Sequence, residues 1–219
     1  MKDYINITCE DNIALMARYP DGYFDLAIVD PPYGIKRAGQ VESFTKNAKH
    51  KRRFHENKEW DDNKPCSEYW DQLFRVSRNQ IIWGANYFTN YIPPSMGWIY
   101  WDKGQKLSMS DGELAFSSFE RALRSVIINR GKISEHGGSI HPTQKPVKLY
   151  KWLLKNYANP GDKILDTHIG SGSIAIAVDS MNKVEGMNLK LTGCELDPEY
   201  YADAMKRIKA QTAQQSLFQ

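Results

Sequence analysis

The sequence predicts a doubly wound α/β domain, in which helices cover both faces of a mostly parallel sheet of seven strands. Three observations lead to this fold class. Short β-branched or aromatic runs recur along the chain, amphipathic helical patterns lie between some of them, and a glycine turn joins one strand to one helix. The length of 219 residues and the hydrophobic content of 41% suit a single packed domain, which we expect to span residues 1–209.

Each strand-like run is too short to be an ordinary helix. The seven runs are Ile5–Cys9, Leu26–Asp30, Gln80–Trp83, Trp98–Trp101, Ser125–Asn129, Ile164–Asp166 and Leu191–Glu195. Apolar residues at three-to-four spacing predict a helix over Val147–Ala158, which the following Asn-Pro-Gly ends. A last helix is expected after Asp197, its predicted N-cap, with Pro198 in the first turn.

Two polar segments lack this periodicity. Residues 34–63 are expected to form a mobile basic loop, because long connections without structure of their own are usually functional. A concentration of positive charge suits a phosphate backbone, although a solvated surface loop is an equal alternative. The basic residues are Lys36, Arg37, Lys46, Lys49, Lys51, Arg52 and Arg53. Residues 210–219 are expected to form a disordered tail.

Several protein classes are excluded by composition. The chain has no apolar run near the length of about 18 residues that spans a bilayer, and its N-terminus lacks the apolar core of a signal peptide. Its three cysteines are too few and too scattered for a disulfide scaffold or a four-ligand zinc site, and the histidines add no ligand spacing. We therefore expect a cytoplasmic protein without a metal.

The segment Ile164–Ala175 has the pattern of a strand, a glycine turn and a helix. Gly170 and Gly172 allow a tight turn and a close approach to a ligand, and Ser173 begins a helix whose free amides attract negative charge. Farther along, Glu195 is placed to accept hydrogen bonds from ribose hydroxyls. This pattern predicts a nucleotide site. It fits a methyltransferase, a nicotinamide-dependent oxidoreductase, or a strand-turn-helix without any ligand.

A second motif, Asp30-Pro31-Pro32-Tyr33, directly follows a predicted strand. The two prolines lack amide hydrogens and make the turn rigid, so that it presents acceptors. The exocyclic amine of a flipped-out base could donate to the Asp30 carboxylate and to the Pro31 carbonyl, while Tyr33 stacks on the base. The alternative is an ordinary Pro-Pro turn capped by an aspartate.

Together these motifs resemble the amino-methyltransferases that act on DNA. Their order, with Asp30–Tyr33 early and the glycine turn late, is similar to that of the β group, a circular permutation of the family fold. Residues 141–146 (HPTQKP) and the segments 101–103 and 110–113 are further points of likeness. The resemblance implies a circularly permuted, Rossmann-like fold that depends on S-adenosylmethionine, in a chain that acts on double-stranded DNA.

The resemblance also implies roles for individual residues. Asp30, Pro31, Pro32 and Tyr33 would be catalytic. The cofactor would be bound by Asp11, Asp30, Lys145, Asp166, His168, Gly170, Gly172, Ser173 and Glu195. The expected reaction is methyl transfer to the 6-amino group of a flipped adenine, with the 4-amino group of cytosine as the alternative and a catalytically idle DNA-binding module or an NAD-dependent oxidoreductase as more distant ones. His168 departs from the family's usual phenylalanine, and a neutral core histidine is an equal alternative there.

Three further expectations concern partners. Residues 120–140 form a short target-recognition stretch, in which Arg121 and Arg124 could contact DNA or belong to a solvated face, so sequence selectivity should be slight. Members of this group often pair as homodimers. The tail resembles the peptide with which bacterial replication proteins dock on the sliding clamp, through Gln214, Leu217 and Phe218, although an incidental tail is the alternative.

Overall fold

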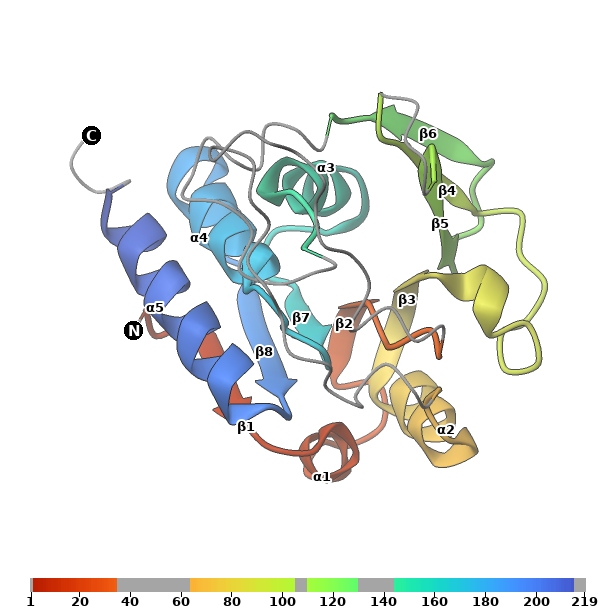
Figure 1. Ribbon diagram of the computed structural model, residues 1–219, viewed down its shortest axis with the longest axis horizontal. Helices are drawn as coiled ribbons and strands as arrows, with labels where there is room; N and C mark the ends of the chain where they lie inside the picture. The colour runs from red at the N-terminus through yellow and green to blue at the C-terminus, as the bar shows by residue number, and fades with distance from the viewer. Residues whose placement is uncertain (1, 35–63, 105–109, 130–143, 215–219) are drawn as a thin grey trace, which may run out of the picture.

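The computed structural model describes residues 2–34, 64–104, 110–129 and 144–214, and it confirms the α/β fold class (Figure 1). The strands are β1 (Ile5–Cys9), β2 (Phe24–Val29), β3 (Ser77–Trp83), β4 (Ile99–Asp102), β5 (Gly112–Ser117), β6 (Arg124–Ile127), β7 (Lys163–Asp166) and β8 (Lys190–Glu195). The helices are α1 (Asn12–Ala17), α2 (Ser67–Val76), α3 (Val147–Tyr157), α4 (Ser173–Glu185) and α5 (Pro198–Gln214), and a 3-10 turn, η3, spans Ala85–Tyr87.

The described strands form one sheet with the order β1-β8-β7-β2-β3-β5-β4-β6. Neighbouring strands run parallel except where β5 pairs with β3 and with β4. The sheet has eight strands rather than the expected seven, because β5 was missing from the prediction. This strand begins with Gly112 and Glu113, residue types that are depleted in strands, so its sequence carries a weak β signal.

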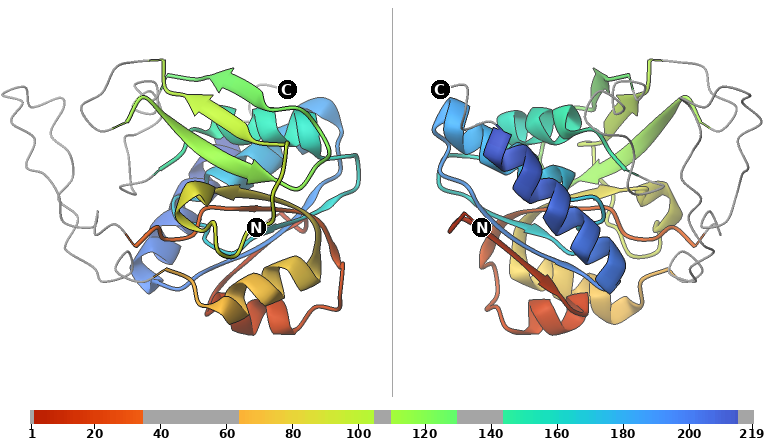
Figure 2. Two further views of the ribbon diagram at one scale, coloured as in Figure 1. Left: turned by 90° about the vertical axis from the view of Figure 1, so that its right-hand side faces the viewer. Right: turned by 60° about the vertical axis from the view of Figure 1, so that its left-hand side comes forward.

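Helices cover both faces of the sheet, as expected (Figures 1 and 2). Side chains alternate along β2, so that Leu26 and Ile28 pack in the core under α3 and α4, while Ala27 and Val29 pack in the core beside α1 and α2. Both cores are fully buried along this strand. Strand β2 therefore lies at the centre of the domain, and the residues that follow it are held by rigid surroundings.

Helix α5 begins as the sequence predicts. Asp197 Oδ1 accepts hydrogen bonds from the backbone amides of Glu199 (2.8 Å) and Tyr200 (3.1 Å), which is the geometry of an N-cap. The helix continues to Gln214, so the tail expected from residue 210 onward is helical over its first part. None of the described helices combines the length and the apolar character needed to cross a membrane.

The two-sided burial of β2 leads to a stability prediction. Ile28 is 1% exposed in the central strand, whereas Ile127 is 72% exposed in the edge strand β6. The substitution Ile28→Ala should lower the free energy of unfolding by about 2–5 kcal/mol, because it leaves a cavity. The same substitution at Ile127 should cost at most about 0.5 kcal/mol. Urea unfolding of both variants measures the difference, and equal losses would contradict it.

Candidate functional site

The predicted motifs meet at one edge of the sheet. Strands β7, β2 and β3 are parallel neighbours, so their carboxyl ends lie side by side. Asp30 follows β2, Gly84 follows β3, and the glycine turn follows β7. In open α/β sheets ligands bind outside the carboxyl ends of the strands. The fold therefore joins segments that are far apart in the sequence into one candidate site.

The glycine turn is held by a carboxylate from the neighbouring strand. Gly170 and Gly172 adopt φ values of +51° and +73°, a region that favours glycine. The Gly170 amide donates to Glu195 Oε2 over 2.9 Å, and Oε1 of the same carboxylate accepts from the Asp197 amide over 3.1 Å. Burial raises the pKa of Glu195. Glu195 thus lies beside the turn, and α4 begins at Ser173 as predicted.

Arg207 of α5 provides a second support for the turn. Its Nη1 donates to the Ser171 carbonyl over 2.6 Å and to Ser173 Oγ over 3.1 Å. A side chain from the last helix therefore fixes the chain where α4 begins. Sequence reasoning missed this contact, since an arginine on an amphipathic helix resembles any other solvated cation.

Asp166 ends β7, and His168 lies two residues after it. Asp166 Oδ1 accepts from the His168 amide over 2.9 Å, and burial raises the pKa of this carboxyl to about 7. Burial lowers the pKa of His168 to about 4, so its ring is neutral. The ring packs edge-on against Tyr69, with centroids 5.5 Å apart. The structure thus places a neutral, largely buried histidine where the family's phenylalanine is expected.

Hydrogen bonds define the tautomer of His168. Asn12 Nδ2 lies 3.1 Å from His168 Nε2 and can only donate, so Nε2 accepts and Nδ1 carries the proton. Nδ1 then donates to Thr167 Oγ1 over 2.9 Å. Asp11, directly before Asn12, caps α1 by accepting from the Ile13 amide over 2.9 Å. His168 therefore links the Asp11 segment to the end of β7.

The first and last residues of the Asp30–Tyr33 motif are hydrogen-bonded to each other. Tyr33 Oη donates to Asp30 Oδ1 over 2.7 Å, and the Tyr33 ring stacks on Tyr87 with centroids 5.1 Å apart and planes 14° apart. Gly84 makes room for this ring, because a Cβ on Gly84 would lie 2.2 Å from Tyr33. Sequence reasoning missed Gly84, which is the left-handed residue (φ +64°) that joins β3 to the stacked Tyr87.

A chain of alternating charges lies behind Asp30. The Lys145 ammonium pairs with Asp30 Oδ2 and with Glu113 Oε2, the latter over 3.2 Å, and Lys103 pairs with Glu113 Oε1 over 3.0 Å. Lys103 and Lys145 are 2% and 4% exposed. The structure directs the Lys145 ammonium toward Asp30 and Glu113, and its expected role in cofactor binding stays a prediction.

The charge state of this network follows from its pairing. Burial raises the pKa of Glu113, but the two lysines outweigh that effect and lower it to about 2. Burial lowers the pKa of Lys145, but Asp30 and Glu113 outweigh it and keep the amine protonated. Burial raises the pKa of Asp30, with the Lys145 charge acting against it. The site therefore places the Asp30 carboxyl group beside the protonated amine of Lys145.

Comparison with known families determines the family of the chain. The family model described as DNA methylase, which covers N6 and N4 methyltransferases, matches residues 81–206, more than half of the chain. The chain belongs to this family. Membership sets aside the nicotinamide-dependent oxidoreductase that the glycine pattern alone left open.

Individual relatives match over shorter stretches. The DNA adenine methyltransferase YhdJ of Escherichia coli K12 is 37% identical over 71 residues, which are 31% of this chain and 21% of that protein. The type II methyltransferase M.HpaI of Haemophilus parainfluenzae is 32% identical over 71 residues, 32% of this chain and 21% of that protein. The matches thus span about a fifth of the length of these relatives.

Solved structures confirm the fold. The M1.HpyAVI-SAM complex has a TM-score of 0.59 at 19% identity and covers 93% of this chain and 99% of its own. The cytosine-N4-specific PvuII DNA methyltransferase has a TM-score of 0.58 at 14% identity and covers 97% of this chain and 93% of its own. The chain therefore has the Rossmann-like fold of DNA methyltransferases.

Within this methylase fold, Arg121 and Arg124 lie away from Asp30. Arg124 begins β6, a strand whose amino end faces the opposite edge of the sheet, since β6 is parallel to β4. The Arg121 guanidinium donates to the Asn156 carbonyl and lies 5.1 Å from the centre of the Tyr157 ring. Both arginines thus lie away from the candidate site, and their contact with DNA stays a prediction.

Other predictions concern residues outside the described part of the chain. They include the seven basic residues of the expected loop: Lys36, Arg37, Lys46, Lys49, Lys51, Arg52 and Arg53. Three other parts of the predictions also lie outside it: residues 130–140 of the expected recognition stretch, residues 141–143, and the Leu217 and Phe218 anchors. Among the residues that are described, no group of three or more histidine, cysteine, aspartate or glutamate side chains is arranged to hold a metal ion.

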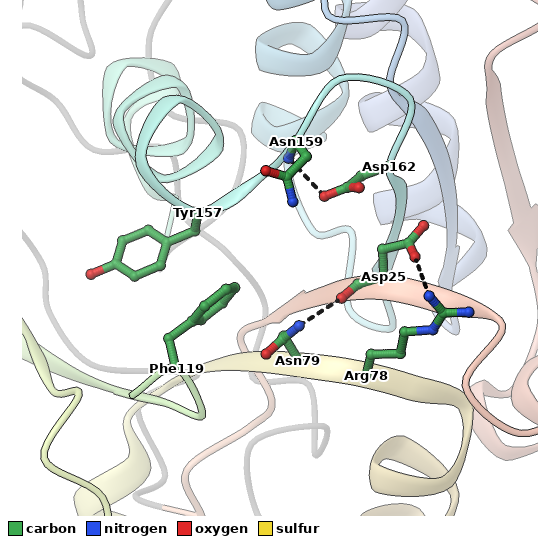
Figure 3. Close-up of a pocket in the computed structure, with 7 residues that line it drawn as sticks. All are labelled: Asp25, Arg78, Asn79, Phe119, Tyr157, Asn159 and Asp162. Atoms are coloured by element: carbon green, nitrogen blue, oxygen red, sulfur yellow. Dashed lines mark hydrogen bonds and ion pairs between the residues drawn. The ribbon is translucent and has the colours of Figure 1, made fainter. Parts of the chain in front are cut away.

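A cavity of about 170 Å³ lies at the opposite edge of the sheet (Figure 3). It is lined by Asp25, Arg78, Asn79, Phe119, Tyr157, Asn159 and Asp162. Asp25 accepts a hydrogen bond from the Lys163 amide (2.9 Å) and forms an ion pair with Arg78 (3.3 Å). Asp162 accepts a hydrogen bond from the Asn159 amide (2.7 Å). These bonds tie the amino ends of the strands together, and we assign the cavity a structural role.

The close contact at Gly84 leads to a prediction. Both Gly84 and Gly186 have a φ of +64°, but a Cβ on Gly186 would meet nothing within 4 Å. Gly186→Ala should cost about 1 kcal/mol of unfolding free energy, the cost of backbone strain alone. Gly84→Ala should cost at least about 1 kcal/mol more, because the Tyr33 ring must move. Chemical unfolding compares the two variants, and equal losses would show that Tyr33 does not depend on Gly84.

The neutral His168 leads to a prediction about pH. Its folded pKa of about 4 lies below the ordinary 6.5, so the unfolded chain binds the proton more readily between these values. Stability should therefore fall as the pH falls from 6.5 toward 4. For the wild type, this loss of unfolding free energy should amount to about 2 kcal/mol. In His168→Phe it should disappear. Unfolding curves from pH 7.5 to 4.5 test this, and parallel slopes for the two proteins would refute it.

Proposed function

We propose that the protein is an S-adenosylmethionine-dependent DNA methyltransferase that acts on the exocyclic amine of a flipped-out base, with adenine as the first choice. The observation that carries this proposal is the juxtaposition of a half-buried carboxyl group, that of Asp30, with the glycine turn after β7 on a parallel neighbouring strand. A methyl acceptor and a methyl donor would need adjoining sites of this kind.

The donor set around the glycine turn fits S-adenosylmethionine. Glu195 offers carboxylate oxygens suited to ribose hydroxyls, and Asp11 lies where α1 begins beside the end of β7. The amino end of α4 offers backbone amides and a positive dipole to the carboxylate of the amino-acid part. The related M1.HpyAVI was solved as a SAM complex. When bound, this cofactor supplies an activated methyl group on a sulfonium.

The chain's own residues would position the acceptor. The Asp30 carboxylate and the Pro31 carbonyl accept the two amine hydrogens, which turns the nitrogen lone pair toward the methyl group. The negative charge of Asp30 then stabilises the positive charge that develops on that nitrogen. Tyr33 and Tyr87 supply aromatic faces on which the base can stack.

The choice of adenine rests on the first residue of the motif. By the pattern of the resembled family, an aspartate at this position favours adenine as the target base. The relative YhdJ is an adenine methyltransferase. The similarly folded PvuII enzyme is cytosine-N4-specific, so the cytosine amine remains the second candidate. Duplex DNA is the proposed partner. A homodimer and a clamp contact through Gln214, Leu217 and Phe218 stay predictions.

Transfer of labelled methyl from S-adenosylmethionine to unmethylated duplex DNA tests the proposal, with nucleoside mass spectrometry to identify the product. Asp30→Ala should lose at least about hundredfold in rate, because the acceptor of the amine hydrogens is gone. Asp71→Ala changes an exposed aspartate of α2 and should retain the wild-type rate.

Cofactor binding separates the causes of a negative result. The wild type and Asp71→Ala should be protected against thermal unfolding by S-adenosylhomocysteine, and Asp30→Ala should keep at least part of this protection, since the glycine turn is unchanged. Methylated cytosine as the product would select the second candidate base. Protection without any transfer by the wild type, or no protection at all, would refute the proposed activity.

A further inference from the structure

The Tyr33 hydroxyl bridges two charged groups. It donates to Asp30 Oδ1 over 2.7 Å and lies 3.4 Å from Lys145 Nζ, from which it accepts. The other partners of Lys145 are Asp30 Oδ2 and Glu113 Oε2. An ammonium has three N–H groups, so each of them is directed to one acceptor, and the longest of the three contacts is the one to the hydroxyl.

This hydroxyl combines a donor and an acceptor, as one edge of an amino base does. In adenine the 6-amino group lies beside the unprotonated N1, and in cytosine the 4-amino group lies beside the unprotonated N3. If Tyr33 moves to stack on a base, it frees one acceptor on Asp30 and one donor on Lys145 together. Those two groups are the complement of the amine and the neighbouring ring nitrogen.

We propose that Lys145 is a specificity-determining residue that donates to the ring nitrogen next to the methylated amine, and that the Tyr33 hydroxyl occupies this place until the base arrives. The inference rests on the proposed function and adds to it the edge of the base that is recognised. A base whose ring nitrogen carries hydrogen at that position, as in thymine, would face the ammonium with a second donor and be rejected.

The surroundings of Lys145 keep it a fixed donor. Glu113 and Asp30 hold its ammonium from two sides, and Lys103 in turn holds Glu113 over 3.0 Å. The Trp83 ring lies 5.2 Å from the Lys145 nitrogen, and the residue is 4% exposed. A donor held in this way loses little entropy when it binds, which favours its use in recognition.

The test uses a base that keeps the amine and lacks the acceptor. Duplexes carry the sequence that the wild-type enzyme methylates, with the target adenine either intact or replaced by 1-deazaadenine, in which N1 is a C–H group. For a cytosine target the matched probe is 3-deazacytosine. The readout is the ratio of kcat/KM for the natural base to that for the deaza base.

The wild type should favour adenine about tenfold to hundredfold, the worth of a hydrogen bond to a charged donor. In Lys145→Met the ratio should be about tenfold to hundredfold smaller than in the wild type, whatever the overall rate. Intrinsic effects of the deaza base on pairing or reactivity cancel, because each variant meets the same two duplexes. A merely structural role would slow both substrates equally and leave the ratio intact.

Two variants guard the comparison. Lys183→Met removes a half-buried lysine of α4 that pairs with Asp179 over 2.9 Å, outside the Asp30 network, and should keep the wild-type ratio. If Lys145→Met fails to fold, Lys145→Met combined with Glu113→Gln keeps the buried charge balanced and serves in its place. A wild-type ratio near one, or a ratio unchanged in the Lys145 variants, would overturn the inference while methyl transfer persists. Absence of transfer by the wild type would instead refute the proposed function.

Discussion

The arrangement of the site depends on the buried charge network of Asp30, Lys145, Glu113 and Lys103. These residues come from the ends of β2 and β4, from β5, and from the segment before α3. Burying one of these charges alone would cost several kcal/mol, so each is tolerable only beside its partners. The two carboxylates and two ammonium groups balance, which fixes where four separate segments meet. The orientation of the Asp30 carboxylate is a consequence of that balance.

A second set of bonds fixes the glycine turn relative to Asp30. Glu195 holds the Gly170 amide, and Arg207 holds the Ser171 carbonyl. Because β7 pairs directly with β2, a turn supported in this way stays at a constant distance from the residue after β2. The two halves of the site need not be close in the sequence, since strand pairing and these contacts set their separation. This explains how a permuted chain order is compatible with the same fold.

Much of the fold could be predicted because local patterns determine it. The short apolar strands, the helix after Pro146 and the Asp197 cap each have a signal of their own. Strand β5 was missed because it begins with Gly112 and Glu113, and α1 because its six residues are too few for a periodic pattern. Helix α2 was also missed, although Tyr69, Trp70, Leu73 and Val76 form a buried stripe at helical spacing.

The site was predicted unevenly for a related reason. Asp30 and Gly170 belong to short motifs whose other members are adjacent in the sequence. These motifs were sufficient to identify both residues as candidates. Glu113, Lys103, Arg207 and Gly84 act through contacts with residues distant in the chain, and a single sequence does not display such pairs. Lys145 shows the difference most clearly. The family resemblance implied a cofactor role for it, which stays a prediction. Its partners Asp30 and Glu113 were not foreseen, although a buried ammonium must lie where carboxylates can compensate it.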